Sequence, residues 1–311
     1  MGVEGRGASG SLLTPGGSSA PLRALAVAVL LCAAITSYRW TVSVSGAVAS
    51  PSRQTSAAAV RDLGKIKHGV LIVLENTDWS KVKGSPSAPY INRTLLPKYA
   101  HSERYYSVGH PSLPNYISVE AGADLGLIDG HYLPSDHSVR THDHLTVYLQ
   151  GAGYSWKYYG ETLPGGGSRC NLTNPAPPYS EDHNPFVYFQ DVSSTQAPSG
   201  FGAPSADSSY CRRHERPYKE LMGDLATNHA PNYSSIVPND YDNGDREAPG
   251  SHCALCQADS FLSHVVPTIQ RSRAYGSGVI FIVWDEGSPG ADNPIGLIAV
   301  SRFAKRGTQA R

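Results

Sequence analysis

Three apolar runs in the chain have the pattern of buried β-strands, and acidic or amide side chains follow each of them within two residues. The runs are HGVLIVL, NYSSIV and GVIFIVW. Short runs that are rich in β-branched residues and bounded by polar ones are typical of strands. The polar residues that follow them are Glu75 and Asn76, Asn239 and Asp240, and Asp285 and Glu286. If the strands are parallel, their carboxyl ends lie at one edge of a sheet, so we expect these side chains to converge there.

Segments with helical spacing alternate with these strands. The clearest are residues 143–153, 218–228 and 259–272, and two further short strands are predicted at 154–161 and 295–301. Strands that alternate with helices indicate an α/β fold with a mostly parallel central sheet and helices on both faces. The predicted fold class is therefore a three-layer αβα sandwich.

The sequence GHPSLPNYISVEAG, residues 109–122, places Ser112 between two prolines, with His110 and Asn115 as polar neighbours. Proline fixes its own backbone φ and restricts the residue before it, which predicts a rigid loop around the serine. Carboxylate and amide oxygens suit a hard or borderline divalent cation. Such a cation can activate a serine hydroxyl and balance charge on a phosphoryl oxygen. An ordinary loop serine and ordinary strand-end turns remain the alternatives.

The charge composition argues against a nucleic-acid partner, because 26 basic residues balance 26 acidic ones and no basic stripe with interleaved aromatic residues is present. Within residues 1–49, the apolar run Ala24–Thr36 is short for a membrane span and matches the core of an export signal, and Ala47–Ala49 fits a cleavage site. We expect a secreted or extracytoplasmic protein with a linker at 50–66 and one domain at 67–311. An uncleaved N-terminal anchor is the alternative, and it would be the chain's only contact with a membrane.

Cleavage after Ala49 leaves four cysteines, and an even number in an exported chain indicates disulfides. Four cysteines allow three pairings, of which we predict Cys170–Cys211 and Cys253–Cys256. The CALC sequence of the second pair also fits zinc binding, redox chemistry or two free thiols. The absence of a second CxxC favours the local disulfide over the zinc site.

Five motifs, VLIVLEN, HPSLPNYISVEAG, HNPFVYF, PND and VIFIVWDEG, occur in an order that resembles the exported bacterial phosphoesterases. That family groups acid phosphatases with non-specific phospholipases C on the alkaline-phosphatase-like αβα fold. The resemblance covers about Lys67 to Ser301, and five ordered motifs are far more specific than one short pattern. It implies the alkaline-phosphatase-like fold for this chain.

The resemblance also assigns roles to the candidate residues. It implies that Ser112 is the nucleophile and that Asn115 orients a phosphate group. It further implies that Glu75 is the first metal ligand with Asn76 as its neighbour. The remaining catalytic candidates are His110 and His183. The remaining metal-ligand candidates are Asn76 and the late acidic pair, Asp285 and Glu286.

Two features of the chain depart from the family pattern. Relatives carry an Asn-Asp-x-His-Asp run after the strand that ends in Pro-Asn, whereas this chain has PNDYDNGDREAPGSHC. Asp240, Asp242 or Asp245 can take the place of the missing ligands, and we expect Asp240 and Asp242 to bind metal. Relatives also continue beyond the last strand, so the stop at Arg311 leads us to expect a truncated C-terminus.

The members most similar in length and in the HPSLPNY motif are acid phosphatases that act on phosphomonoesters. The resemblance therefore implies a phosphate ester substrate and a divalent metal cation as cofactor. Two alternatives remain open. One is a phospholipase C-type phosphodiesterase, and the other is a non-catalytic binding protein that keeps the fold.

Overall fold

The computed structural model describes residues 64–174, 177–288, 293–305, 307 and 309–310, and these lie in one compact unit, Thr41–Arg311. An eight-stranded sheet with the order β4-β3-β5-β1-β6-β7-β2-β8 forms its centre. The strands are β1 (His68–Leu74), β2 (Ala100–Ser102), β3 (Trp156–Gly160), β4 (Glu215–Pro217), β5 (Tyr233–Val237), β6 (Gly278–Trp284), β7 (Leu297–Val300) and β8 (Gln309–Ala310). The predicted export segment at 1–49 and most of the linker at 50–66 lie outside the described residues.

The sheet is mostly parallel, as the sequence predicts. β4, β3, β5, β1 and β6 run in the same direction, whereas β7 pairs antiparallel with both β6 and β2. β1 is central because its side chains are apolar on both faces, and all five residues from Val70 to Leu74 are buried. A strand buried on both faces needs helices on both sides of the sheet.

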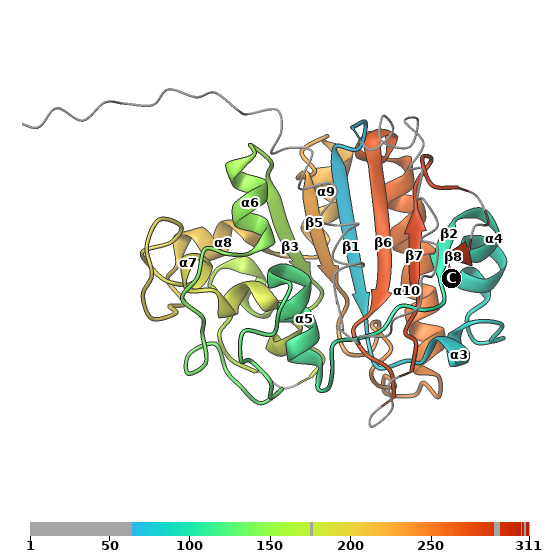
Figure 1. Cartoon of the computed structure of the whole chain (residues 1–311), viewed down its shortest axis with the longest axis horizontal. Helices are drawn as coiled ribbons and strands as arrows, with labels where there is room; N and C mark the ends of the chain where they lie inside the picture. The colour runs from blue at the N-terminus through green and yellow to red at the C-terminus, as the bar shows by residue number, and fades with distance from the viewer. Residues whose placement is uncertain (1–63, 175–176, 289–292, 306, 308, 311) are drawn as a thin grey trace, which may run out of the picture. The chain divides into compact units, whose positions relative to one another are not determined.

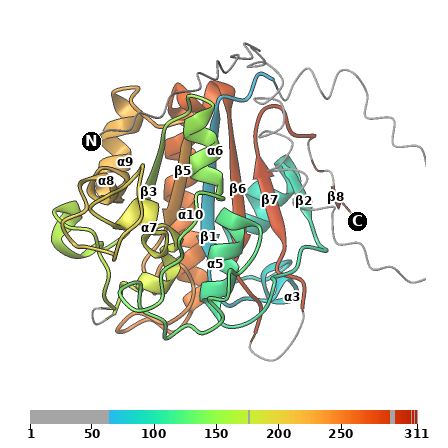
Figure 2. The ribbon, with the colours of Figure 1, turned by 60° about the vertical axis from the view of Figure 1, so that its left-hand side comes forward.

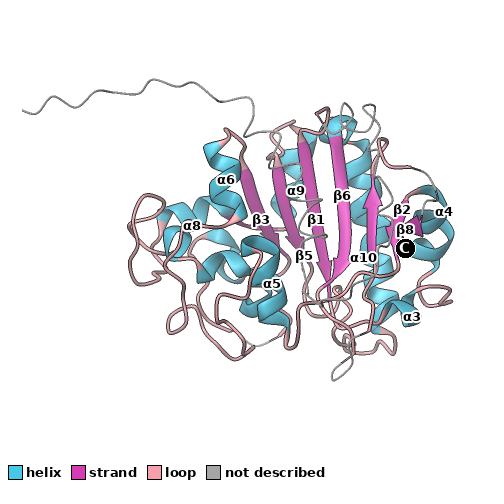
Figure 3. Cartoon of the chain, viewed as in Figure 1, coloured by secondary structure: helices cyan, strands magenta, loops and turns pink. Residues whose placement is uncertain are grey.

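Helices cover the sheet on both faces (Figures 1 and 2). α5 (Ser112–Ala121) and α6 (Leu145–Gly151) lie in front of it in Figure 1, and α9 (Lys219–Ala226) and α10 (Ala254–Arg271) lie behind it. The three layers are also visible when the chain is coloured by secondary structure (Figure 3). The shorter helices are α3 (Trp79–Val82), α4 (Leu96–Lys98), α7 (Gln190–Ser193) and α8 (Ser209–His214).

The helical period of α10 explains its packing. Its buried apolar residues recur every three or four positions, which places them on one face: Ala258, Phe261, Leu262, Val265, Val266 and Ile269. The predicted helix at 259–272 is thus confirmed, although it begins five residues earlier, at Ala254. No helix among the described residues is long and apolar enough to cross a membrane.

The rigid loop predicted around Ser112 is wrong, because Ser112 is the first residue of α5. Pro114 is tolerated there, since the first N–H groups of a helix have no intrahelical acceptor. The helix ends at Ala121, and the next residue, Gly122, caps it with a positive φ of 73°. The prolines therefore mark the start of a helix, and the serine side chain takes its direction from that helix.

Both predicted disulfides are present. Cys170 and Cys211 are 41 positions apart in the sequence, and their Cα atoms are 5.5 Å apart. Cys253 and Cys256 are bonded at the start of α10, with Cα atoms 5.2 Å apart. The readings of the CALC sequence as a zinc site or as free thiols are therefore wrong.

Glu120 on α5 leads to a prediction about stability and pH. Its side chain is buried and accepts a hydrogen bond from the hydroxyl group of Tyr233 at 3.0 Å. Burial raises the pKa of Glu120 from 4.5 to about 8, although that hydrogen bond opposes the shift. Because the folded-state pKa is raised, the stability that Glu120 contributes is complete below pH 4.5 and is lost as the pH rises through 8.

We therefore expect Glu120→Gln to remove this pH dependence. Relative to the parent, the variant's free energy of unfolding should rise by about 4 kcal/mol between pH 5 and pH 9. Urea unfolding at both pH values measures the difference. Glu247→Gln, at an exposed position, is the matched control. If the free energies of unfolding of the parent and of Glu120→Gln change equally with pH, burial does not raise the pKa of Glu120.

Candidate active site

The three strand ends singled out in the sequence lie side by side, because β5, β1 and β6 are neighbours in the sheet. The backbone N–H of Asp285 donates to the carbonyl oxygen of Leu74 at 2.9 Å, which continues the β1–β6 pairing beyond both strands. The backbone N–H of Glu75 donates to the carbonyl oxygen of Asn243 at 3.0 Å, which holds the segment after β5 against the end of β1. The predicted convergence of these groups at the carboxyl edge is confirmed.

Asn76 turns the chain sharply at the end of β1. Its φ of 44° lies in the left-handed region, which asparagine tolerates better than most residues. This conformation directs its backbone N–H to Oδ1 of Asp285 at 3.2 Å and its side-chain amide to Oδ1 of Asp245 at 3.1 Å. Asn76 thus links segments that follow three different strands.

Ser112 lies next to the buried carboxyl group of Glu75. Its Oγ donates to Oε2 of Glu75 at 3.1 Å, and Ser112 itself is 7% exposed. Tyr116, one helical turn later on α5, donates its hydroxyl hydrogen to Oε1 of the same carboxyl group. Residues four apart share one face of a helix, so α5 presents both hydroxyls to the end of β1.

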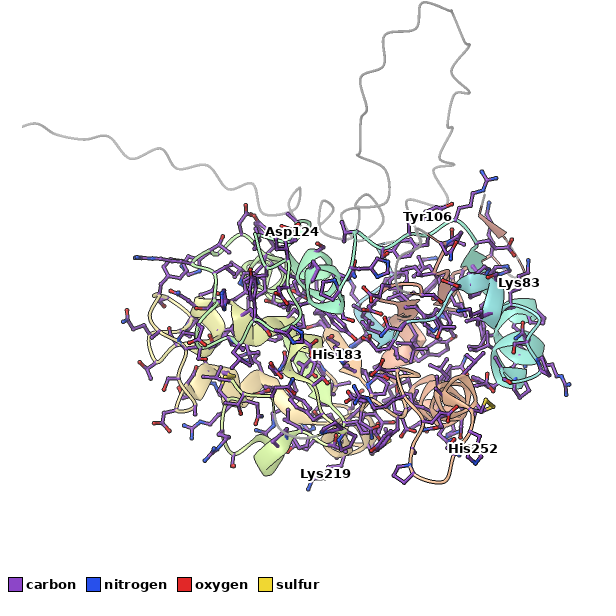
Figure 4. All side chains as sticks on the ribbon, turned by 90° about the horizontal axis from the view of Figure 1, so that it is seen from below. Lys83, Tyr106, Asp124, His183, Lys219 and His252 are labelled. Atoms are coloured by element: carbon purple, nitrogen blue, oxygen red, sulfur yellow. A yellow bond between two sulfur atoms is a disulfide. The ribbon has the colours of Figure 1, made fainter. Side chains whose placement is uncertain are left out.

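His183 connects two of the carboxylates. It comes from the 3₁₀ turn Glu181–His183, and its ring stacks on Tyr116 with 5.2 Å between centroids. Its Nε2 is 3.6 Å from Oε1 of Glu75, and its Nδ1 is 3.9 Å from Oδ1 of Asp240. Figure 4, which views the chain from the carboxyl edge, shows His183 near the middle of this face.

Asn115 and His110 both contact Glu286. The amide nitrogen of Asn115 donates to Oε2 of Glu286 at 3.2 Å, and Nδ1 of His110 is 3.0 Å from the same oxygen. The side-chain oxygen Oδ1 of Asn115 accepts from the backbone N–H groups of Val108 and Gly109. Asn115 therefore holds the loop before α5 against the end of β6. Its orientation of a phosphate group stays a prediction.

The segment after β5 contributes Asp240 and Asp245 to this site but not Asp242. Asp240 is 1% exposed and accepts from Ser180, whereas Asp245 accepts from Asn76 as described above. Asp242 lies elsewhere, with its carboxyl group hydrogen-bonded to that of Glu161. The turn explains the difference, because Oδ1 of Asn239 accepts the N–H groups of residues 241 and 242 and reverses the chain between the two aspartates.

Burial and the repulsion between neighbouring carboxylates raise the pKa values of the acidic groups at the site. Burial raises the pKa of Glu75 well above its usual range, and Asp285 raises it further. Burial also raises the pKa of Asp285, and His183 partly opposes that shift. The pKa of Glu286 is raised to about 7, first by burial and then by Asp285. A cation placed among these carboxyl groups would favour their ionised forms and so lower their pKa values.

The oxygen atoms available at the site are suitable ligands for a divalent cation. At the ends of β1, β5 and β6, three buried acceptor oxygens have no hydrogen-bond partner among the described residues: Oδ1 of Asn76, Oδ1 of Asp240 and Oδ2 of Asp285. Buried oxygens without donors are what a hard cation binds. One group of three His, Cys, Asp or Glu residues in the described part of the chain has its ligand atoms within 4.8 Å of one another, and it consists of Cys170, Cys211 and Glu215. The two cysteines of this group form a disulfide, so the group is not a metal site. The carboxyl groups around Glu75 are spaced more widely.

Three residues at the site were not among the sequence candidates, namely Tyr116, Asp182 and Arg246. Tyr116 is the most buried of them, and Asp182 raises the pKa of Glu75, as does Asp245, which the sequence offered as an alternative ligand. Arg246 lies 3.6 Å from Asp240 and 3.0 Å from Asp245. A helical interpretation of residues 112–121 would have identified Tyr116. Nothing in the local sequence distinguishes Asp182 or Arg246 from other surface charges.

The family model for the phosphoesterase family matches residues 85–291. The chain belongs to this family. It is 28% identical over 293 residues to a phosphatidylinositol-3-phosphatase of Mycobacterium tuberculosis, a match that covers 92% of this chain and 82% of that protein. It is 27% identical over 222 residues to a phosphate-repressible acid phosphatase of Penicillium chrysogenum, a match that covers 70% of this chain and 47% of the fungal enzyme. The chain thus spans less than half the length of that relative.

A crystal structure of a protein in the alkaline phosphatase superfamily from Vibrio parahaemolyticus has a similar fold. The TM-score is 0.51 at 12% identity, over 79% of this chain and 62% of the other. The fold class predicted from the sequence is confirmed as alkaline-phosphatase-like. Together with the family, these relatives define the chain as a phosphoric ester hydrolase.

Proposed function

We propose that the chain is an exported, metal-dependent acid phosphatase that hydrolyses phosphomonoesters through Ser112. The observation that carries the proposal is the hydrogen bond of 3.1 Å from Oγ of Ser112 to the buried Glu75, at the carboxyl edge where β1, β5 and β6 end. An exposed loop serine would have no buried carboxyl partner. The two disulfides and the apolar run near the N-terminus support export.

The residues that would hold the divalent cation are Glu75, Asn76, Asp240 and Asp285. Three of them offer the buried acceptor oxygens that lack a donor, and Glu75 supplies the carboxyl group that faces Ser112. When bound, a cation at such a site balances charge on a phosphoryl oxygen and favours the ionised form of a nearby hydroxyl. Glu286 is held by Asn115 and His110, so we assign it to positioning.

The start of α5 provides the binding site for the phosphate group. Ser112 is the first residue of this ten-residue helix, and no side chain of the described residues caps the helix N-terminus. The N–H groups of the first turn and the positive end of the helix dipole favour an anion there. The phosphorus atom of the substrate would then lie next to Oγ of Ser112.

The reaction takes two displacements at phosphorus. In the first, Oγ of Ser112 gives up its proton toward Glu75 and forms a bond to phosphorus, the ester P–O bond breaks, and the alcohol leaves with a proton. His110, whose side chain is 26% exposed at the site, is placed to deliver that proton. In the second, the oxygen of a water molecule bonds to phosphorus, the bond to Oγ breaks, Oγ takes up a proton from that water, and phosphate is released. His183 keeps Glu75 oriented through its stack on Tyr116.

A substrate panel tests this function. We expect hydrolysis of p-nitrophenyl phosphate that a chelator abolishes and an added divalent cation restores. Phosphatidylinositol 3-phosphate is the second substrate, because the mycobacterial relative is named for it and it is also a phosphomonoester. Release of phosphocholine from a phosphatidylcholine emulsion would favour the phospholipase C reading instead. No turnover of any of the three, in folded protein supplied with cations, would favour the non-catalytic reading.

A further inference from the structure

The disulfide in the CALC sequence is accessible, and the proposed phosphatase reaction does not use it. Cys253 is the N-cap residue of α10, an 18-residue helix, and Cys256 lies in its first turn. Both cysteines are partly exposed, whereas Cys170 and Cys211 are 1% and 0% exposed. His252, directly before the pair, is exposed and projects at the periphery of the view in Figure 4. A reductant can therefore reach one disulfide and not the other.

The start of α10 stabilises a thiolate on Cys253. The backbone N–H of Cys256 donates to Sγ of Cys253 at 3.2 Å, which is the geometry of a helix N-cap. The positive end of the helix dipole lowers the pKa of a thiol at this position. Cys253 is therefore the better leaving group, and an incoming thiolate would attack Sγ of Cys256.

The two disulfides also constrain the chain differently. Cys253 and Cys256 are three positions apart, whereas Cys170 and Cys211 are 41 positions apart. Closing a short loop restricts the unfolded chain less than closing a long one. Reduction of the short disulfide therefore costs the fold less, so that the folded protein can exist in both redox states.

Gln257 connects the start of α10 to the segment 239–252, which carries Asp240. Its Oε1 accepts from the N–H of Ala248 at 3.1 Å, and its Nε2 donates to the carbonyl oxygen of Tyr241 at 3.1 Å. Both bonds depend on a first helical turn that stays in place. The disulfide holds that turn, because it joins the N-cap residue to the third residue of the helix.

We propose that Cys253 and Cys256 are a thiol–disulfide exchange site for a dithiol protein, and that reduction loosens the segment 239–252. A thiolate of the partner attacks Sγ of Cys256, the Cys253–Cys256 bond breaks, and Cys253 leaves as a thiolate that takes up a proton. The second thiol of the partner then releases Cys256. The chain gains two electrons and two protons, and the partner becomes a disulfide. Any change in activity that follows from loosening the segment 239–252 rests on the proposed function.

Thiol mapping tests the exchange site directly. The native chain is equilibrated with graded dithiothreitol, or with thioredoxin as the protein dithiol, and is then alkylated and mapped by mass spectrometry. We expect both cysteines of the peptide that contains residues 253–256 to become alkylated at reductant levels about tenfold or more below those that open Cys170–Cys211. Simultaneous opening of both disulfides, or opening of Cys253–Cys256 only in denaturant, would overturn the proposal.

Hydrogen exchange tests the coupling without relying on catalysis. We expect the amides of residues 239–252 to exchange at least about threefold faster in the reduced protein, with little change in β1. The double variant Cys253→Ser and Cys256→Ser keeps an N-cap side chain and should reproduce this faster exchange without reductant. Unchanged exchange in both samples would remove the coupling. If neither redox state hydrolyses p-nitrophenyl phosphate or phosphatidylinositol 3-phosphate with a divalent cation present, the proposed function fails, while these readouts still decide the exchange site.

Discussion

Replacing Ser112 with alanine should lower the turnover of p-nitrophenyl phosphate by about a thousandfold or more, because the covalent route loses its only nucleophile. The fold should survive, since the change removes one oxygen from the first turn of α5. The oxygen donates to Glu75 and also interacts with Asp285, and Tyr116 continues to donate to the carboxyl group of Glu75. Steady-state kinetics and thermal unfolding of the same preparation measure the two effects together.

Ser118 is the internal control for this experiment. It lies on the same helix, and its Oγ has no hydrogen-bond partner among the described residues. Ser118→Ala should keep turnover within about threefold of the parent. Acid quenching during turnover, followed by peptide mapping, should place a phosphoryl group on the peptide that contains Ser112. Near-normal turnover of a folded Ser112→Ala protein would defeat the assignment and direct attention to a nucleophilic water molecule.

The parallel centre of the fold could be predicted from the sequence because burial on both faces leaves an unmistakable pattern. β1 and β6 are continuous apolar runs, and the sheet buries almost every residue of both. The position of the acidic residues after these runs then fixes which edge of the sheet carries them. Neither step needs knowledge of a contact between distant segments, and both therefore succeed from local sequence alone.

The nucleophile helix could not be predicted in the same way. Two prolines within four residues argue against a helix unless the first one precedes it and the second lies in its first turn, which is how Pro111 and Pro114 are placed. Missing the helix also meant missing Tyr116, whose role depends on lying one turn from Ser112. The placement of Asp242 failed for a similar reason, because the side chain of Asn239 reverses the chain locally and no periodic pattern records such a turn.

Removing a charge from the cluster around Glu75 should have opposite effects with and without metal. Glu75 is 0% exposed, and burial together with Asp285 raises its pKa well above the usual range, so the metal-free protein carries a destabilised carboxyl group. Glu75→Gln and Asp285→Asn should therefore be at least as stable as the parent in the presence of a chelator. When a divalent cation is added, the parent's Tm should rise, and both variants should lose most of that rise.

Metal content and activity should fall together in these variants, with the affinity for the cation reduced by about a hundredfold or more. Elemental analysis of dialysed protein, and the Tm as a function of cation concentration, measure this without an assay of turnover. Asp242→Asn is the matched control, because it removes an aspartate that the structure pairs with Glu161 instead. If Asp242→Asn loses the cation and Glu75→Gln retains it, the metal site lies around Glu161, and the convergence of strand ends at Glu75 serves the orientation of Ser112 alone.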